Sequence, residues 1–146
     1  MIGPKTPRMQ GATLRRNAYR VVDDRDEYID CRTGLYLGPD RAEHHHRQFL
    51  GRGGEDTPEN LVTLLGPGNA AGTHGWAHGE REARLLGYAI PGWVTDVAMV
   101  PIHRVLPKTR RIGWALQQGA LVVPVTEEFA AERMTQLGIW TRGERP

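Results

Sequence analysis

Apolar side chains recur at helical spacing near the start of the chain. Leu14, Ala18, Val21 and Val22 form one stripe with the period of an amphipathic helix. This pattern predicts a helix over about residues 14–27, with several arginines on its other faces. For any one of these arginines we favour a solvated position over a contact with phosphate.

Two segments in the middle of the chain have strand patterns, and a helical segment follows them. AEHHHR (42–47) fits a strand whose side chains alternate between two faces, and LVTLL (61–65) is apolar and partly β-branched. The segment between them is rich in glycine and reads as a loop, so we expect an antiparallel hairpin. A helix is predicted over about residues 74–86, ended by Gly87.

The last third of the chain predicts a second group of elements. MVPIHRVL (99–106) indicates an edge strand interrupted by Pro101. A second hairpin is predicted from RRIGWAL (110–116) and ALVVPV (120–125). A short helix is expected to start at Thr126, because two glutamates in its first turn suit the positive end of the helix dipole.

Length and composition are those of one globular α+β domain. We divide the 146 residues into a flexible lead (1–12), a core (13–90) and an extension of the same domain (91–146). No run of about 18 apolar residues and no signal-peptide core is found, which predicts a cytoplasmic protein without a membrane segment. Cys31 is the only cysteine, so a disulfide framework or a cysteine-based zinc site within the chain is excluded.

The charge is compatible with a nucleic-acid partner without requiring one. The net charge is only +2, with a pI of about 9.0. Nothing in the sequence pattern favours a particular oligomeric state.

Five of the six histidines lie between Glu43 and His78, and their spacing suggests a metal site. His74 and His78 are four residues apart, so on a helix they face the same way and can share one divalent metal ion. A third imidazole from a neighbouring strand would complete three protein ligands and leave positions for water or substrate. A single HxxxH pair is a weak signal, but together with His44-His45-His46 on a strand it is hard to attribute to chance.

The segment from Cys31 to Gly87 resembles the HNH endonucleases with the ββα-metal fold, especially the compact forms of bacteriophages and prophages. The matching residues are His45-His46-Arg47, Gly53-Gly54, Pro58-Glu59-Asn60-Leu61 and His74-Gly75-Trp76-Ala77-His78. Counting back from the glycines and from Asn60 places the family's histidine pair at His45-His46. His44 is then an extra strand residue.

The resemblance implies a ββα-metal core, flanked by the N-terminal helix and by the C-terminal hairpin and short helix. It implies that His46 is the general base, a role that suits an imidazole with an ordinary pKa of about 6.5. It also implies that Asn60 orients the His46 ring through a hydrogen bond. His45, His74 and His78 would hold one divalent cation that binds the scissile phosphate and stabilises the leaving oxygen.

The metal is not fixed by the resemblance. Imidazole ligands favour zinc or nickel, whereas magnesium or manganese could serve because phosphate and water supply oxygen ligands. Many relatives carry two CxxC pairs for a structural zinc, but Cys31 has no partner, so we expect no second metal. Asn69 is an alternative last ligand, since some relatives use asparagine there; we prefer the pair His74 and His78 because helical spacing explains both.

The expected substrate is DNA, bound through its phosphates. Arg47 follows the predicted base, Arg52 lies in the glycine-rich loop, and Arg81 is seven residues past His74 on what would be the same helix face. Each could reach a backbone phosphate, which predicts weak sequence preference and strong salt dependence. The resemblance suggests a phage or prophage protein that acts in a bacterial host, beside the terminase during DNA packaging.

Two other functions compete with a nuclease. A non-catalytic, metal-stabilised nucleic-acid-binding module would use the same ligands, but it would not need His46 and Asn60. A peptidase of the zincin type requires a glutamate after the first histidine of HxxxH, and Gly75 occupies that position.

Overall fold

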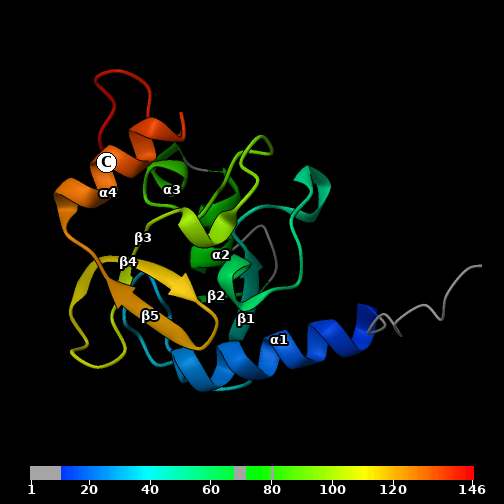
Figure 1. The fold of residues 1–146 in the computed structure, drawn as a ribbon. Coiled ribbons are helices and arrows are strands. Elements are labelled where there is room, and N and C mark those ends of the chain that lie inside the picture. The colour runs from blue at the N-terminus through cyan, green and yellow to red at the C-terminus, as the bar shows by residue number, and fades with distance from the viewer. Residues whose placement is uncertain (1–10, 68–71, 80) are drawn as a thin grey trace, which may run out of the picture.

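The computed structural model describes residues 11–67, 72–79 and 81–146, which form an α+β fold (Figure 1). The helices within these residues are α1 (Gly11–Asp26), α2 (Gly72–Gly79), α3 (Arg81–Leu85) and α4 (Glu127–Gln136). The strands are β1 (Ala42–His46), β2 (Leu61–Leu65), β3 (Ile102–Val105), β4 (Ile112–Gln118) and β5 (Leu121–Pro124). None of the described helices has the length and apolar character needed to span a membrane.

The first sheet is the predicted hairpin. Strands β1 and β2 pair antiparallel, with His46 opposite Leu61 and His44 opposite Thr63. Two short 3₁₀ helices, Leu50–Arg52 and Pro58–Asn60, shape the loop between the strands. Helix α2 follows β2 and packs against it, as Figure 1 shows.

The helix predicted over residues 74–86 is present as two described helices, α2 and α3. Helix α2 starts earlier than expected, at Gly72, and α3 ends at Leu85. Gly87 follows with a φ of +87° and lies against the backbone of Pro101, where a Cβ would overlap the carbonyl oxygen. Only glycine fits this turn, because it combines a left-handed conformation with close backbone approach.

The second sheet has the order β3-β4-β5, so the predicted edge strand joins the predicted second hairpin. Helix α4 then begins where the sequence indicated. The hydroxyl oxygen of Thr126 accepts a hydrogen bond of 3.0 Å from the amide of Phe129, which caps the first turn.

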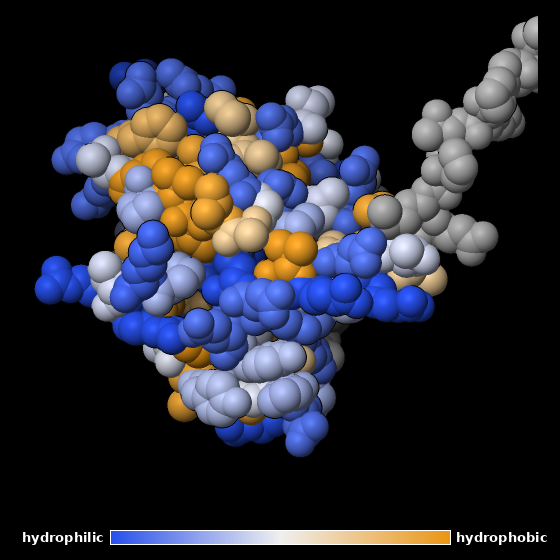
Figure 2. All heavy atoms as spheres, turned by 60° about the horizontal axis from the view of Figure 1, so that its bottom comes forward, coloured by the Kyte–Doolittle hydropathy of each residue, from blue (hydrophilic) through white to orange (hydrophobic). Residues whose placement is uncertain are grey.

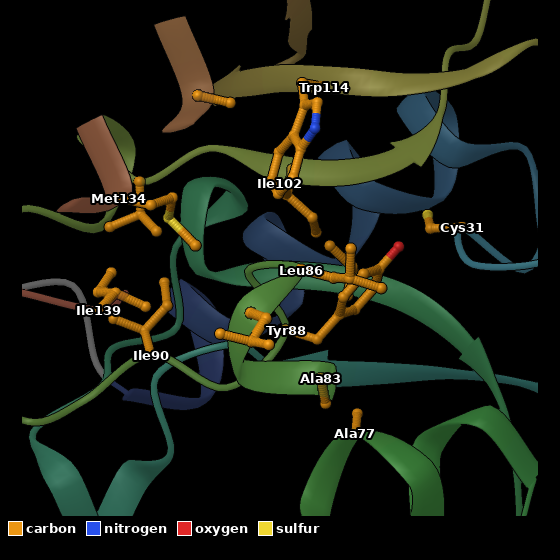
Figure 3. Close-up of a cluster of buried hydrophobic side chains, with 14 of the residues drawn as sticks. Cys31, Ala77, Ala83, Leu86, Tyr88, Ile90, Ile102, Trp114, Met134 and Ile139 are labelled. Atoms are coloured by element: carbon orange, nitrogen blue, oxygen red, sulfur yellow. The ribbon is translucent and has the colours of Figure 1, made fainter. Parts of the chain in front are cut away.

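One hydrophobic core joins the two halves of the chain. Buried side chains of α2 and α3 pack together with those of β3, β4 and α4, among them Ala77, Ala83, Ile102, Trp114 and Met134 (Figure 3). The residues after position 90 therefore support the segment that carries the histidines.

Helix α1 packs on the hairpin through a smaller apolar cluster of Ala18, Val22 and Leu61, and lies along the lower edge of the view in Figure 1. It begins at Gly11 and ends at Asp26, close to the predicted span of 14–27. Of the predicted flexible lead, residues 1–10 lie outside the described residues, and residues 11 and 12 belong to α1.

Candidate metal centre

Three histidines from two elements converge at one point. His45 of β1 and His74 and His78 of α2 each offer a ring nitrogen, and these atoms lie within 4.8 Å of one another. The ring centroids are 5.1 Å apart for each pair. The three side chains predicted to be metal ligands could therefore hold one ion.

The local structure explains the convergence. One helical turn separates His74 from His78, so both project from the same side of α2. Alternation along β1 buries His45 against His74 and His78 and leaves its neighbours His44 and His46 partly exposed. His44 accordingly contacts α1, where its ring stacks on Tyr19 at 3.9 Å and its Nε2 lies 2.7 Å from Oδ1 of Asp23.

Hydrogen bonds fix which nitrogen of His45 is free. Its Nε2 lies 2.6 Å from the carbonyl oxygen of Tyr88. A carbonyl oxygen only accepts, so Nε2 carries the proton and Nδ1 keeps a lone pair. That Nδ1 is buried and has no hydrogen-bond partner within the described residues, which suits it to bind a metal ion.

His74 has a similar arrangement with a carboxylate. Its Nδ1 lies 2.7 Å from Oε2 of Glu43, the residue that precedes the histidine run on β1. An ionised carboxylate only accepts, so Nδ1 donates and Nε2 is available to a metal. Carboxylates in this position orient a ligating imidazole and fix its tautomer.

Two of the three imidazoles are held neutral. Burial lowers the pKa of His45 to about 3, although the hydrogen bond to the Tyr88 carbonyl acts in the opposite direction. The pKa of His78 is also lowered, first by burial and then by His74 and Arg52. Neutral imidazole is the form that binds metal, so the residues present fit a divalent cation.

His46 has a carboxylate partner of its own. Its Nε2 lies 2.8 Å from Oδ1 of Asp56, and Oδ2 of Asp56 accepts a 3.3 Å bond from Nε of Arg15 on α1. Burial alone would raise the pKa of Asp56, but the hydrogen bonds from His46 and Arg15 and the charge of Arg15 lower it. An ionised Asp56 leaves Nδ1 of His46 as the nitrogen that can take up a proton.

The candidate base and two candidate ligands share a cavity of about 290 Å³. It is lined by His44, His46, Phe49, Leu50, His74 and His78. In this cavity, which we call the histidine pocket, His46 lies beside His74 and His78, two of the three convergent imidazoles.

Phe49 and Arg52 border the histidine pocket. The Phe49 ring stacks on His78 at 4.5 Å with an angle of 18° between the planes. The guanidinium of Arg52 lies over the same ring, 4.5 Å from its centroid, and Arg52 is exposed. This exposed position beside the pocket suits the predicted contact between Arg52 and a phosphate, which stays a prediction.

Arg47 is not a substrate contact, and this prediction was wrong. Its side chain is fully buried and donates to the carbonyl oxygens of Gly87 (2.8 Å), Glu59 (3.1 Å) and Val100 (2.8 Å). The alternation that turns its neighbour His46 towards α1 and the pocket turns Arg47 into the interior. There its hydrogen bonds join the end of β1 to the segment that follows α3 and to the segment that precedes β3. The buried guanidinium cannot reach a phosphate.

Arg81 has an acidic partner outside the histidine segment. It opens α3, and its side chain pairs with Glu144 near the C-terminus at 3.0 Å. The side chain remains 63% exposed. The shared helix face of His74 and Arg81 stays a prediction, because residue 80, between α2 and α3, lies outside the described residues.

Asn60 supports the loop rather than the ring of His46. Its Oδ1 accepts from the Gln48 amide (2.7 Å), and its Nδ2 donates to the carbonyl oxygens of Gln48 and Glu55 (3.0 Å each). The partner of the His46 ring is Asp56, so the predicted hydrogen bond between Asn60 and that ring is not formed. The nearby Gly54 leaves room for this arrangement, since a Cβ there would overlap the Gln48 carbonyl.

Sequence reasoning missed the two carboxylates, Glu43 and Asp56. The available signal was their position beside the histidine motif, because acidic partners commonly orient functional imidazoles. Asn69, the alternative metal ligand, lies outside the described residues.

Comparisons of the chain with protein-family models, with curated proteins and with solved structures found no match.

Proposed function

We propose that this chain is a metal-dependent endonuclease of the HNH type that hydrolyses phosphodiester bonds of DNA. In this proposal β1, β2 and α2 form its ββα-metal core. The observation that carries the proposal is that His46 lines the same pocket as His74 and His78, two of the three convergent imidazoles. The three convergent imidazoles suit a cation, and His46, with its carboxylate partner, suits a general base.

His46 would take the proton from an attacking water at Nδ1. Asp56 would then stabilise the imidazolium through the hydrogen bond at Nε2, as the aspartate does in a catalytic triad. Arg15 holds the second oxygen of Asp56, which keeps that carboxylate ionised and oriented.

His45, His74 and His78 would hold the cation. When bound, a divalent metal would supply positive charge to the scissile phosphate and to the leaving oxygen. The three nitrogen donors favour zinc or nickel, and magnesium or manganese stay candidates because substrate and water can complete an oxygen-rich shell. Arg52, exposed beside His78, is the described arginine best placed to contact the same phosphate.

The biological setting rests on the resemblance to phage and prophage enzymes. On that basis we propose a role in phage DNA processing in the cytoplasm of a bacterial host, with the terminase as a partner.

Cleavage of supercoiled plasmid tests the proposal. Purified protein is incubated with EDTA, Mg²⁺, Mn²⁺, Ni²⁺ or Zn²⁺ in parallel, beside His46→Ala and the control His103→Gln, which changes a histidine outside the pocket. We expect nicking that requires a metal, that falls by about 100-fold or more in His46→Ala, and that persists in His103→Gln. If no metal supports cleavage, or if His46→Ala cuts like the wild type, the nuclease proposal fails.

Metal binding separates the nuclease from the non-catalytic binding module. Competition with a chromogenic chelator should give one ion per chain for the wild type and for His46→Ala, and a large loss of affinity for His74→Ala. A protein that binds metal and DNA without ever cleaving would be the binding module. Retention of full metal affinity by His74→Ala would contradict the ligand assignment.

A further inference from the structure

Helix α1 is basic over its first three turns. Between residues 11 and 22 it carries three arginines and no carboxylate. Arg15, Arg16 and Arg20 are exposed and line one flank of the helix, which we call the arginine flank. Figure 2 shows a hydrophilic band across the face on which α1 lies.

The arginine flank borders a groove of about 490 Å³, lined also by Tyr19 and Tyr28. Asp23 and Asp24 lie at the end of the groove towards the C-terminus of α1. The groove therefore has a basic end and an acidic end, and an anion would be attracted to the basic one.

The groove adjoins the histidine pocket at two points. Tyr19, which lines the groove, stacks on His44, which lines the pocket. Arg15, which also lines the groove, donates to Asp56, the partner of His46. A polymer that places one phosphate in the pocket can thus continue along α1.

Two charges of the flank are uncommitted. Among the described residues, Arg16 and Arg20 make no hydrogen bond or ion pair with the protein. A planar guanidinium without a protein partner is well suited to bidentate contact with phosphate.

The span of the flank fits a nucleic-acid backbone. Five residues of helix separate Arg15 from Arg20, an axial rise of about 7.5 Å. A helix lying along the duplex axis would span about two phosphates of one strand over this length, since each strand carries one phosphate per about 3.4 Å of axis.

We propose that the arginine flank binds the phosphate backbone of double-stranded DNA next to the histidine pocket. The substrate class rests on the proposed function, whereas the surface is assigned by the charge and geometry of α1.

Duplex DNA fits better than the other polyanions. The flank offers charge rather than a stacking platform, because one face of the Tyr19 ring is covered by His44; single strands are usually held by exposed aromatic rings. An anionic membrane would require an outward apolar face, but Ala18 and Val22 of α1 are buried against Leu61.

Equilibrium binding in EDTA tests the proposal without involving the metal or cleavage. The affinity of full-length protein for a labelled 20-base-pair duplex is measured over a range of salt concentrations, for the wild type and for Arg16→Gln/Arg20→Gln. The control is Arg142→Gln/Arg145→Gln, which makes the same change in net charge at two exposed C-terminal residues. Thermal unfolding confirms that each variant is folded.

We expect the flank variant to bind roughly tenfold or more weakly, with a slope of log K against log salt that is about 1.8 less negative, since each lost phosphate contact changes it by about 0.9. The control should match the wild type. Equal affinity of flank variant and wild type, equal weakening of the control, or no binding of duplex by the wild type would overturn the proposal.

Two further probes distinguish the other partners. A dependence on Arg16 and Arg20 that appears only with a single strand of the same length, or only with vesicles containing phosphatidylserine, would also overturn it. Failure of plasmid cleavage with this duplex-binding pattern intact would count against the nuclease and leave the surface assignment standing.

Discussion

At the residue scale, the candidate site depends on which ring nitrogen each histidine keeps free. The Tyr88 carbonyl fixes His45, and the Glu43 carboxylate fixes His74. Asp56 fixes the candidate base His46 in the same way. Each of these oxygen atoms accepts a hydrogen bond from one ring nitrogen and so decides which nitrogen keeps the lone pair that can bind a cation or a proton.

Replacing Asp56 by Asn should slow cleavage and leave metal affinity unchanged. An amide can still accept the hydrogen bond from Nε2 of His46, but it does not stabilise the imidazolium. We expect a fall of about 10–100-fold in the single-turnover rate.

The matched control is Asp40→Asn, which removes an exposed carboxylate in a turn away from the pocket. An unchanged single-turnover rate in Asp56→Asn would show that Asp56 does not act through His46.

The metal-free protein should lose stability as the pH falls from about 6.5 to about 3 because of His45. The pKa of His45 is about 3 in the folded protein and near 6.5 when unfolded, so the unfolded chain binds the proton more readily in this range. The stability that neutral His45 contributes above pH 6.5 therefore decreases as the pH falls, by at most about 1.4 kcal/mol of unfolding free energy per pH unit.

Urea unfolding in EDTA at pH 7.5 and pH 5.0 measures this effect, with His45→Leu for comparison. The wild type should lose more stability between the two values than the variant does. Equal losses would mean that His45 is not buried in its neutral form.

At the element scale, the loop between β1 and β2 is held by Asn60. The three hydrogen bonds of its buried amide join both ends of the loop. This contact controls where β1 ends, and hence where His46 and Phe49 face the pocket.

Asn60→Ala should lower the free energy of unfolding by about 3 kcal/mol, at about 1 kcal/mol for each lost hydrogen bond. Cleavage should fall with it because the loop loses its order. Asn60→Asp, which keeps the acceptor and loses the donors, should be intermediate in both. A variant Asn60→Ala as stable as the wild type, but inactive, would instead support a direct role of Asn60 on His46.

At the scale of the whole molecule, one buried carboxylate joins three elements. Asp26 of α1 accepts from Nε of Arg25 (2.7 Å), from Nη2 of Arg104 on β3 (2.8 Å) and from the amide of Thr63 on β2 (3.1 Å). Burial alone would raise the pKa of Asp26, but Arg104 and Arg25 lower it well below its usual range.

The protein should therefore lose stability in acid. A carboxyl with a lowered folded pKa contributes stability above its unfolded pKa, near 4, and that contribution is lost as the pH falls further. Asp26→Asn should cost about 3–5 kcal/mol at pH 7, because it leaves two buried guanidinium groups without their anion.

Thermal unfolding between pH 7 and pH 2.5 checks this prediction. The variant should show a weaker dependence on acid than the wild type, and Asp40→Asn should behave like the wild type. A wild type with the same stability at pH 7 and pH 3 would contradict this account of Asp26.

Local patterns predicted most of the elements. The hairpin of β1 and β2, the strands of the second sheet and the start of α4 were all readable from periodicity and capping residues. The convergence of His45 with His74 and His78 could also be predicted from the sequence. The fixed repeats of strand and helix determine on which side of its element each of these side chains lies.

The roles of Arg47, Asn60 and Asp56 were decided only by the tertiary structure. Arg47 looked like a phosphate contact because it directly follows His46, but its side chain donates to carbonyl oxygens of residues 12 to 54 positions away. Such partners leave no periodic signal, since they are set by how separate elements pack. The sequence by itself determined which imidazoles share a face. Packing determined which carboxylate and carbonyl oxygens accept hydrogen bonds from those imidazoles, because these contacts join residues that no local repeat connects.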